Sequence, residues 1–457
     1  LIAHDNMSVS KAVSVGWASG TIGSSMALGA MSLLVLFYLT EYVGLSPSLA
    51  GLLIFISRIW DIAATLVIGN WSDRTAGRWG KRVPFLVAGA PIIAVAYFML
   101  FAVPEGLDGV LLSAYVLGTL LLYATGYTLF VVPYLAVPAE ITDVPQQRTT
   151  MMSFRVFFMT VAGLIVAGLG PLLITQFGGG RGGYAGMGAV HAIIILLAML
   201  GCAAIVSRVP VIISGSIATG SIFDQLRIVM RNRPFKIFIG VKLCQLMAGA
   251  MVGASLLYLG RYILGLDESF LGRFIIYQTA GTILSLPVWS AISKRYGKKM
   301  TYIGAGYFYA LVALSWLFAS STEIFWITNI RIFMVGVAAS GILVLGFSIL
   351  PDTMAHNTKT TGIAQEGTLA ALYSMVEKGT AAFGPLVVGL LLEASGFISA
   401  AGGAWPETQP DTAFLAILLL ASVGPALCNI AGSLLMIKFD LKENRAEAPA
   451  PAPAPGS

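Results

Sequence analysis

Long apolar runs separated by short polar links dominate the chain. Most runs reach about 20 residues, the length that an α-helix needs to cross the hydrocarbon layer of a bilayer. The links are too short to hold separate soluble domains, so we predict an all-α membrane protein with twelve transmembrane helices. The predicted spans are 16–40, 49–71, 83–103, 110–138, 150–176, 187–208, 235–260, 270–292, 300–319, 324–350, 367–393 and 411–437.

The composition supports this class. Apolar residues make up 57% of the 457 residues and charged residues only 11%, whereas a soluble domain carries roughly 25% charged residues. The formal net charge is +6, but most Lys and Arg lie in links on one predicted side of the membrane, so we expect no nucleic-acid partner. The three cysteines are Cys202, Cys244 and Cys428, and they lie inside apolar runs without the spacing of a metal site. We therefore expect no metal and no cofactor.

The charges in the links predict the orientation. Links with acidic and few basic residues alternate with links that are rich in Arg and Lys. Because basic links stay on the cytoplasmic side, we predict a multi-pass protein of a bacterial-type inner membrane with both termini in the cytoplasm. The links predicted to face outward are 41–48, 104–109, 177–186, 261–269, 320–323 and 394–410.

A five-residue pattern occurs twice. Residues 78–82 read Arg-Trp-Gly-Lys-Arg and residues 295–299 read Arg-Tyr-Gly-Lys-Lys, and a Trp-Ser pair precedes each copy. Basic links in general collect such charges, but the shared glycine and aromatic residue favour a true repeat. We therefore predict two six-helix bundles, as in transporters with a substrate site near the midplane. The predicted parts are an N-terminal bundle (1–208), a cytoplasmic linker with an amphipathic helix (209–234), a C-terminal bundle (235–440) and a disordered tail or appended linker (441–457).

Charged side chains inside the spans are the strongest candidates for function. In hydrocarbon each costs at least about 2.5–3.5 kcal/mol, so it needs a partner, water or a task. Arg58 and Asp61 lie three residues apart on one helical face, with Thr65 one turn further. A buried Asp61 opposite Lys378 would have two charge states that a cation could bias. A pair that only fixes helix packing remains the alternative.

Three other intramembrane charges leave alternatives open. Arg155 either pairs with a carboxylate across the bundle or clamps a carboxylate or hydroxyls of the substrate. Glu377 points about 100° away from its neighbour Lys378, which favours a structural role. Lys242 could extend its stem toward the cytoplasmic surface.

Aromatic residues occur in the same region of the sequence. Trp17, Tyr123, Tyr127 and Tyr373 all lie inside predicted spans, although interface belts also use Trp and Tyr. Tyr123 and Tyr127 are one turn apart, and two prolines further along their span permit a bend next to a cavity. We expect their hydroxyl groups to orient a polar ligand.

Two segments carry a resemblance to a known family. Residues 57–61 (Ser-Arg-Ile-Trp-Asp) and 69–74 (Gly-Asn-Trp-Ser-Asp-Arg), followed by the basic pattern at 78–82, resemble the glycoside-pentoside-hexuronide:cation symporters. This family is the melibiose-permease branch of the major facilitator superfamily, and the resemblance extends over all twelve spans. It implies the major facilitator fold and import by alternating access.

The resemblance also implies roles for single residues. Asp61 and Lys378 occupy positions that the family uses for cation coupling, and Tyr127 and Arg155 occupy positions that it uses near the substrate. Where sugar-transporting members carry a second acidic residue, this chain has Thr65. A sodium site is then incomplete, so a proton is the simpler coupling ion.

Other departures concern the substrate. The carboxylate that binds sugar hydroxyls in melibiose-type members is replaced by Val131. The position of a second family carboxylate aligns near Gly23 or Ser24, neither of which is acidic. Without these acids the pocket is less negative, which suits an anionic substrate such as a uronate, or an amphipathic one. For the inner gate we predict ion pairs and helix-end contacts that involve Asp73, Arg74 and Arg78, with Lys294 and Arg295 as the second copy.

The sequence thus predicts a secondary symporter that imports a small organic solute, such as a glycoside or uronate, together with H+ or Na+. An amphipathic, lysolipid-like or other non-sugar substrate is the alternative. No P-loop, His-Glu-x-x-His sequence or nucleophile elbow occurs, so an enzyme is not supported. We expect a monomer, because one bundle encloses its own pathway.

Overall fold

The computed structural model describes residues 10–75, 80–142, 144–209, 233–267, 269–361, 366–400 and 409–440. These residues form helices and short connections, with no strand among them. Eleven helices are long and apolar enough to cross a membrane, or twelve if α1 (Lys11–Leu33) and α2 (Val35–Glu41), which are bent by 46°, form one span. This confirms the predicted all-α membrane protein.

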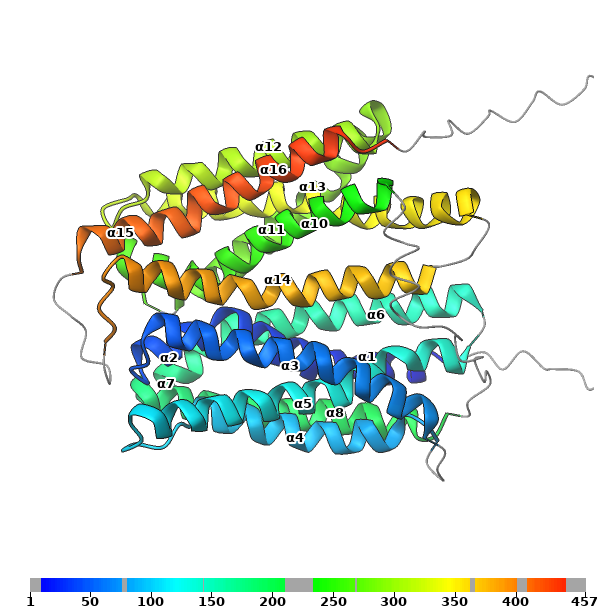
Figure 1. The fold of residues 1–457 in the computed structure, drawn as a ribbon, viewed down its shortest axis with the longest axis horizontal. Coiled ribbons are helices and arrows are strands. Elements are labelled where there is room, and N and C mark those ends of the chain that lie inside the picture. The colour runs from blue at the N-terminus through cyan, green and yellow to red at the C-terminus, as the bar shows by residue number, and fades with distance from the viewer. Residues whose placement is uncertain are drawn as a thin grey trace, which may run out of the picture.

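Two groups of helices pack side by side in Figure 1, with α3 of the first group against α14 of the second. The first group adds to α1 and α2 the helices α3 (Pro47–Arg74), α4 (Val83–Phe101), α5 (Gly109–Ile141), α6 (Pro145–Leu164), a π-helical turn η1 (Ile165–Leu169), α7 (Gly170–Gln176) and α8 (Gly180–Val206). The second group consists of α10 (Arg233–Tyr258), η2 (Leu259–Ile263), α11 (Ser269–Tyr296), α12 (Lys298–Leu314), η3 (Ser315–Phe318), α13 (Phe325–Thr361), α14 (Glu366–Ala394), α15 (Asp411–Leu418), η5 (Leu419–Val423) and α16 (Gly424–Ile437).

Local sequence signals explain where several helices begin. The Ser10 side chain accepts a hydrogen bond of 3.2 Å from the backbone N–H of Val13 and so caps α1. Proline stands at the first position of α3 and α6, where its missing N–H has no intrahelical partner in any case. These signals supplement the hydropathy pattern, which gives the spans but not their ends.

The glycine of the repeated basic pattern has the same φ in both copies. Gly80 precedes α4 and Gly297 precedes α12, and each has φ of 79°. This left-handed region favours glycine, because a side chain clashes there with the backbone. The shared φ supports the interpretation of the two segments as a structural repeat.

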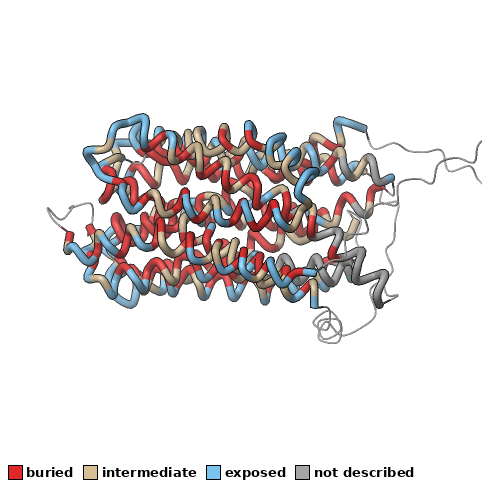
Figure 2. The backbone as a smooth tube through the Cα atoms, turned by 90° about the horizontal axis from the view of Figure 1, so that it is seen from above, coloured by how far each residue is buried: buried red, intermediate tan, exposed pale blue. Residues whose placement is uncertain are grey.

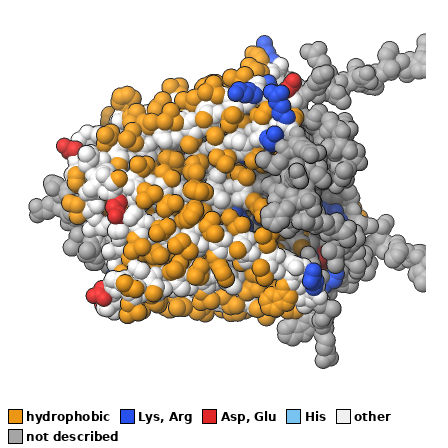
Figure 3. Space-filling model, in the orientation of Figure 1, with side chains coloured by type: hydrophobic (Ala, Val, Ile, Leu, Met, Phe, Trp, Pro, Cys, Tyr) orange, Lys and Arg blue, Asp and Glu red, His pale blue; other side chains and the backbone are white. Residues whose placement is uncertain are grey.

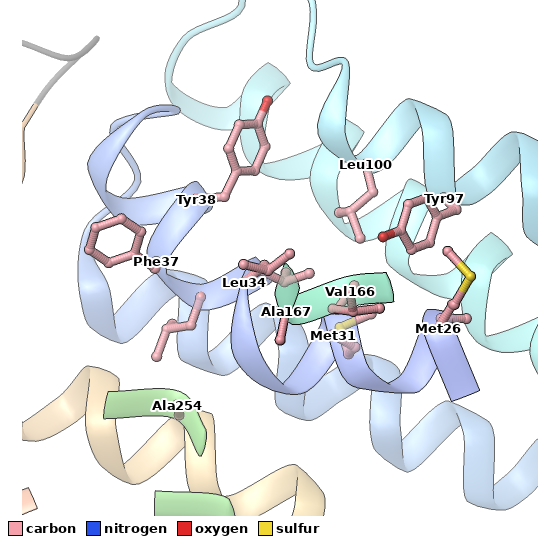
Figure 4. Packing of buried hydrophobic residues seen from close by; sticks show 14 of the residues in the cluster. Met26, Met31, Leu34, Phe37, Tyr38, Tyr97, Leu100, Val166, Ala167 and Ala254 are labelled. Carbon is pink, nitrogen blue, oxygen red and sulfur yellow. The ribbon is translucent and has the colours of Figure 1, made fainter. Parts of the chain in front are cut away.

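The core extends from one helix group into the other. Figure 2 shows that buried residues line the inside of the helices along their length. In Figure 4, Leu34 and Tyr38 at the junction of α1 and α2 pack near Leu100 of α4 and Ala167 of η1, and Ala254 of α10 lies close by. These residues belong to one buried cluster, so the two groups share apolar contacts at this end of the molecule.

The surface matches a bilayer. Figure 3 shows a broad hydrophobic face with Lys and Arg gathered at one end of the molecule, which we call the basic end. The opposite end carries the links predicted to face outward, and we call it the outer end. A large contiguous apolar surface is unfavourable in water, so this face is the lipid-facing belt of a multi-pass membrane protein.

Several boundaries differ from the sequence prediction. Helix α8 begins at Gly180, inside the predicted link 177–186. Glu41, assigned to the link 41–48, is the last residue of α2 and is 0% exposed. Helix α13 continues to Thr361, beyond the predicted span 324–350, because apolarity marks the membrane and not the helix end. Residues 210–232 of the predicted linker and the tail 441–457 lie outside the described residues, so the four-part division stays a prediction.

Candidate functional site

A carboxylate and an ammonium group from opposite helix groups meet between α3 and α14. Asp61 of α3 lies 3.3 Å from Lys378 of α14, measured from Oδ2 to Nζ. The Lys378 ammonium also donates a 2.8 Å hydrogen bond to Thr65 Oγ1, and Thr128 of α5 donates to Asp61 Oδ1. Asp61 is 1% exposed, whereas 24% of the Lys378 side chain is exposed. The structure thus brings together Asp61, Thr65 and Lys378.

The helix geometry of α3 explains this cluster. Thr65 lies one turn after Asp61 and donates its own hydroxyl proton to the Asp61 backbone carbonyl at 2.7 Å. Its oxygen is therefore oriented as an acceptor for Lys378. The carboxylate is held by a hydroxyl and an ammonium, and only the ammonium comes from the other helix group. Any change in the charge of Asp61 consequently acts on a contact between the two groups.

Unpartnered polar atoms lie next to this pair. No ion pair joins Arg58 to Asp61, and Arg58 Nε is buried without a hydrogen-bond partner. The hydroxyl of Tyr123 is buried and unpartnered as well, and its ring stacks on Tyr127 at 6.3 Å between centroids. Arg58 and Asp61 both act electrostatically on the two tyrosines. Buried polar groups in this state are expected to bind water or a ligand.

Trp17 lies elsewhere, in the core of the first helix group. It is fully buried, and its indole N–H donates a 3.1 Å hydrogen bond to the backbone carbonyl of Tyr134. The two rings stack at 4.7 Å, and the Tyr134 hydroxyl is hydrogen-bonded to Thr21 at 2.7 Å. The structure therefore does not bring an open Trp17 face to the Asp61 cluster.

A group of charges surrounds Glu377. The carboxylate interacts electrostatically with Lys242 and Lys378 of its own helix group and with Arg155 of the first group. Arg155 Nε is buried without a hydrogen-bond partner. Tyr373 lies in α14, but its side chain is outside the described residues. Together with Arg58, these side chains give the region near Asp61 more cations than carboxylates.

The residues predicted for the inner gate lie at helix ends. Arg74 is exposed at the end of α3, and Lys294 and Arg295 are exposed in the last turn of α11. The Asp73 side chain and all of Arg78 lie outside the described residues. None of the three exposed cations forms an ion pair with another described residue.

A neighbouring basic residue forms the contact that sequence reasoning missed. Arg82 donates two hydrogen bonds, of 2.9 and 2.6 Å, to Glu140 Oε1 and one of 2.6 Å to Ser72 Oγ. This joins the ends of α3 and α5 to the start of α4. The only signal in the sequence was the place of Glu140 just after the predicted span 110–138.

Hydrogen bonds close the outer end. Glu41 Oε2 accepts a 2.6 Å hydrogen bond from the Tyr262 hydroxyl and a 3.3 Å bond from the backbone N–H of Ala400. Thr40 and Tyr258 share a 2.6 Å bond between their hydroxyl groups. Each bond joins α2 to the second helix group, so the two groups are tied together at this end.

Backbone packing of α3 against α14 completes the closure. A Cβ atom at Gly51 would lie 2.7 Å from the carbonyl oxygen of Pro385, and one at Gly389 would lie 2.1 Å from that of Pro47. Small residues allow helices to approach this closely in a membrane. The outer end is therefore shut by direct helix contact.

A cavity of about 380 Å³ lies within the second group and reaches α1. Its walls are mostly apolar, with amide and hydroxyl groups from α10, α11, α12, α13 and α16. The polar lining residues are Gln245, Gln278, Thr282, Tyr309, Ser340 and Asn429, and Leu33 contributes from α1.

Comparisons with known proteins agree on one family. The family model described as MFS/sugar transport protein matches residues 16–443. The glucuronide carrier protein homolog of Escherichia coli is 26% identical over 86% of this chain and 86% of its own. The sodium-dependent lysophosphatidylcholine symporter 1-B of Danio rerio is 23% identical over 90% of this chain and 83% of its own.

Solved structures show the same fold. A bacterial homolog of the human lysosomal transporter Spinster, in its inward-facing and unoccupied conformation, aligns with a TM-score of 0.66. The alignment covers 95% of this chain and 100% of that chain at 14% identity. At this identity the likeness shows the major facilitator fold with its two six-helix bundles, and nothing about the substrate.

Proposed function

We propose that this chain imports a glycoside, a uronate or a related sugar derivative together with a cation. The reason is that the chain belongs to the MFS/sugar transport family and, within it, to the glycoside-pentoside-hexuronide:cation symporters. The chain is a transporter and not an enzyme. The observation that carries the proposal is the Asp61–Lys378 pair, because it joins the two bundles and contains a group that can gain and lose charge.

In this mechanism the charge of Asp61 controls a contact between the bundles. Cation binding at Asp61 neutralises the carboxylate, so Lys378 loses its ionic partner. An anionic substrate then brings negative charge back to the region around Lys378. When cation and substrate leave, the pair forms again. Because the pair bridges α3 and α14, its two states favour different positions of the bundles.

We propose the proton as the coupling ion. The hydrogen bonds of Asp61 and Lys378 form a cluster in which Asp61 is the sole described carboxylate. A sodium ion would have to displace the Lys378 ammonium and assemble further oxygen ligands, whereas a proton needs only the carboxylate itself. Asp61 and Thr65 are then the cation-coupling residues, with Lys378 as the counter-charge.

The balance of charge supports an anionic sugar derivative. The cations Arg58, Arg155 and Lys378 outnumber the carboxylates Asp61 and Glu377 in this region. The unpartnered Nε atoms of both arginines can donate to oxygen atoms of the substrate. We assign substrate binding to Arg58, Tyr123, Tyr127 and Arg155. Tyr373 and Trp17 remain candidates that only the sequence suggests.

An amphipathic lysolipid-like substrate is the second candidate. A relative is named for lysophosphatidylcholine, and the cavity next to α10 is mostly apolar.

We further propose that the protein is a monomer in the lipid bilayer of a bacterial inner membrane, with both termini in the cytoplasm. We propose no nucleic-acid partner. Asp73, Arg74, Arg78, Lys294 and Arg295 remain our candidates for the inner gate.

A thermal-shift panel tests the substrate class. Purified protein is heated with p-nitrophenyl β-glucuronide, p-nitrophenyl β-glucoside or lysophosphatidylcholine, and a ligand that binds the folded state raises the melting temperature. We expect the largest rise with the glucuronide. Stabilisation by the lysolipid alone would contradict the sugar assignment and favour the second candidate.

A further inference from the structure

Lys242 is a buried cation that the mechanism above does not use. It lies nine residues after the start of α10, about 14 Å along the helix at 1.5 Å per residue. Its sequence position suggested that the stem extends to the cytoplasmic surface, but the residue is only 3% exposed. The side chain instead points into the protein.

The ammonium group has fewer partners than it can use. Lys242 Nζ donates a 2.6 Å hydrogen bond to Gln245 Oε1, and it lies 5.9 Å from the ring centroid of Phe238. No described carboxylate lies within ion-pair distance of it. An ammonium carries three donors, and a buried charge without a counter-charge is unfavourable. Two donors of Lys242 thus have no partner among the described residues.

The surroundings hold the ammonium in place. The Tyr302 hydroxyl donates a 3.1 Å hydrogen bond to the same Gln245 oxygen, which fixes the amide. A Cβ atom at Gly346 would lie 2.1 Å from Lys242 Nζ, so the absence of a side chain there makes room for the charge. The site is built by α10, α12 and α13 together.

This site is next to the cavity and to the central charges. Gln245 lines the cavity of about 380 Å³, which Leu33 of the first bundle also lines. Glu377 of α14 acts electrostatically on Lys242, and Lys378 and Arg155 act in turn on Glu377. A ligand in the cavity can therefore reach the Gln245 amide from within the second bundle, next to α1 of the first.

We propose that Lys242 and Gln245 form a subsite in the C-terminal bundle that binds the carboxylate of an anionic sugar. The ammonium supplies the charge, and the amide N–H of Gln245 supplies a second donor. This inference rests on the proposed function, which supplies a sugar as the substrate. It adds the assignment of the carboxylate to the C-terminal bundle, opposite Arg58 and Tyr123.

The test compares two probes that differ in one group. Dissociation constants of p-nitrophenyl β-glucuronide and p-nitrophenyl β-glucoside are measured by calorimetry on the purified full chain and on Lys242→Gln. We expect glucuronide binding to weaken about 10- to 100-fold, as for loss of a charged hydrogen bond, and glucoside binding to change less than about twofold. Lys236→Gln, an exposed lysine on the same helix, is the matched control.

A second variant covers the case in which Lys242→Gln does not fold. Gln245→Glu places a carboxylate next to Lys242 and gives the ammonium an internal partner. We expect it to fold and to lose the preference for the glucuronide over the glucoside. The preference should persist in Lys236→Gln.

The outcomes separate this inference from the proposed function. A wild-type chain that binds the glucuronide, with unchanged affinity in Lys242→Gln or Gln245→Glu, overturns the subsite alone. Equal weakening of both probes in a folded variant does the same, because it indicates a structural lysine. A wild-type chain that binds neither probe overturns the sugar assignment and the subsite together.

Discussion

The two bundles meet in two places that differ in chemistry. At the outer end, Glu41 and Tyr262 form a hydrogen bond, and α3 and α14 touch through backbone at Gly51 and Gly389. Further along α3 and α14, at the central contact, the two bundles are joined by the ion pair of Asp61 with Lys378. The outer contacts are many, buried and close-packed, whereas the central contact depends on one charge. We infer that the outer contacts hold the closed shape and that the central pair decides when it opens.

The central contact gives the largest expected effect. In Asp61→Asn the side chain keeps its size but cannot change charge, so uptake against a gradient should fall at least about 100-fold while substrate binding is retained. Solute accumulation in proteoliposomes under an imposed pH gradient measures this. Asp411→Asn, at an exposed helix start, should transport normally. Normal accumulation by Asp61→Asn would refute the coupling role.

The same pair predicts an effect on stability. Lys378→Met leaves the Asp61 carboxylate buried without its ammonium, which costs about 3–5 kcal/mol when the charge cannot be relieved. Removing both charges in Asp61→Asn with Lys378→Met should restore part of this loss. Melting temperatures of the two single variants and the double variant form the cycle. Additive losses would show that the two side chains are not energetically coupled.

The outer contacts should be sensitive to size. In Gly389→Val the added atoms meet the carbonyl oxygen of Pro47, so α3 and α14 must separate. We expect a population with an open outer end, seen as a longer distance between spin labels at Ser46 and Ala394. Gly118→Val is the control, because a Cβ atom at Gly118 meets nothing within 4 Å. An unchanged distance distribution in Gly389→Val would argue against a packed closure.

A single outer hydrogen bond should have the smallest effect. Tyr262→Phe removes the donor to Glu41, a change of about 1 kcal/mol, and should shift the open fraction about fivefold. The same spin labels measure it. Tyr307→Phe serves as the control, because Tyr307 is exposed. A shift larger than that of Gly389→Val would reverse the proposed order of the outer contacts.

The sequence predicts the fold well because the bilayer imposes it. A span needs a fixed apolar length, so the predicted spans coincide with the observed helices to within a few residues at most ends. The repeat was readable for a similar reason, because Gly80 and Gly297 need a backbone conformation that other residues disfavour. The end of α13 was not readable, since no apolarity marks a helix outside the membrane.

The site is only partly readable from the sequence. Asp61 and Lys378 stand out because charges are rare and costly in a span. Thr128 and Gln245 do not stand out, since hydroxyl and amide side chains are common in helices and reveal their partners only through packing. Glu41 was assigned to a link because acidic residues usually lie there, and its burial depends on Tyr262, which is 221 residues away.

The most direct test of the central claim is a simultaneous measurement of proton and solute flux. Proteoliposomes that contain a pH-sensitive dye receive p-nitrophenyl β-glucuronide from outside, without an imposed pH gradient. We expect wild-type protein to move protons inward together with the solute, and Asp61→Asn to exchange solute with no proton movement. Proton flux of wild-type size in Asp61→Asn would contradict the claim that this carboxylate couples the cation to transport.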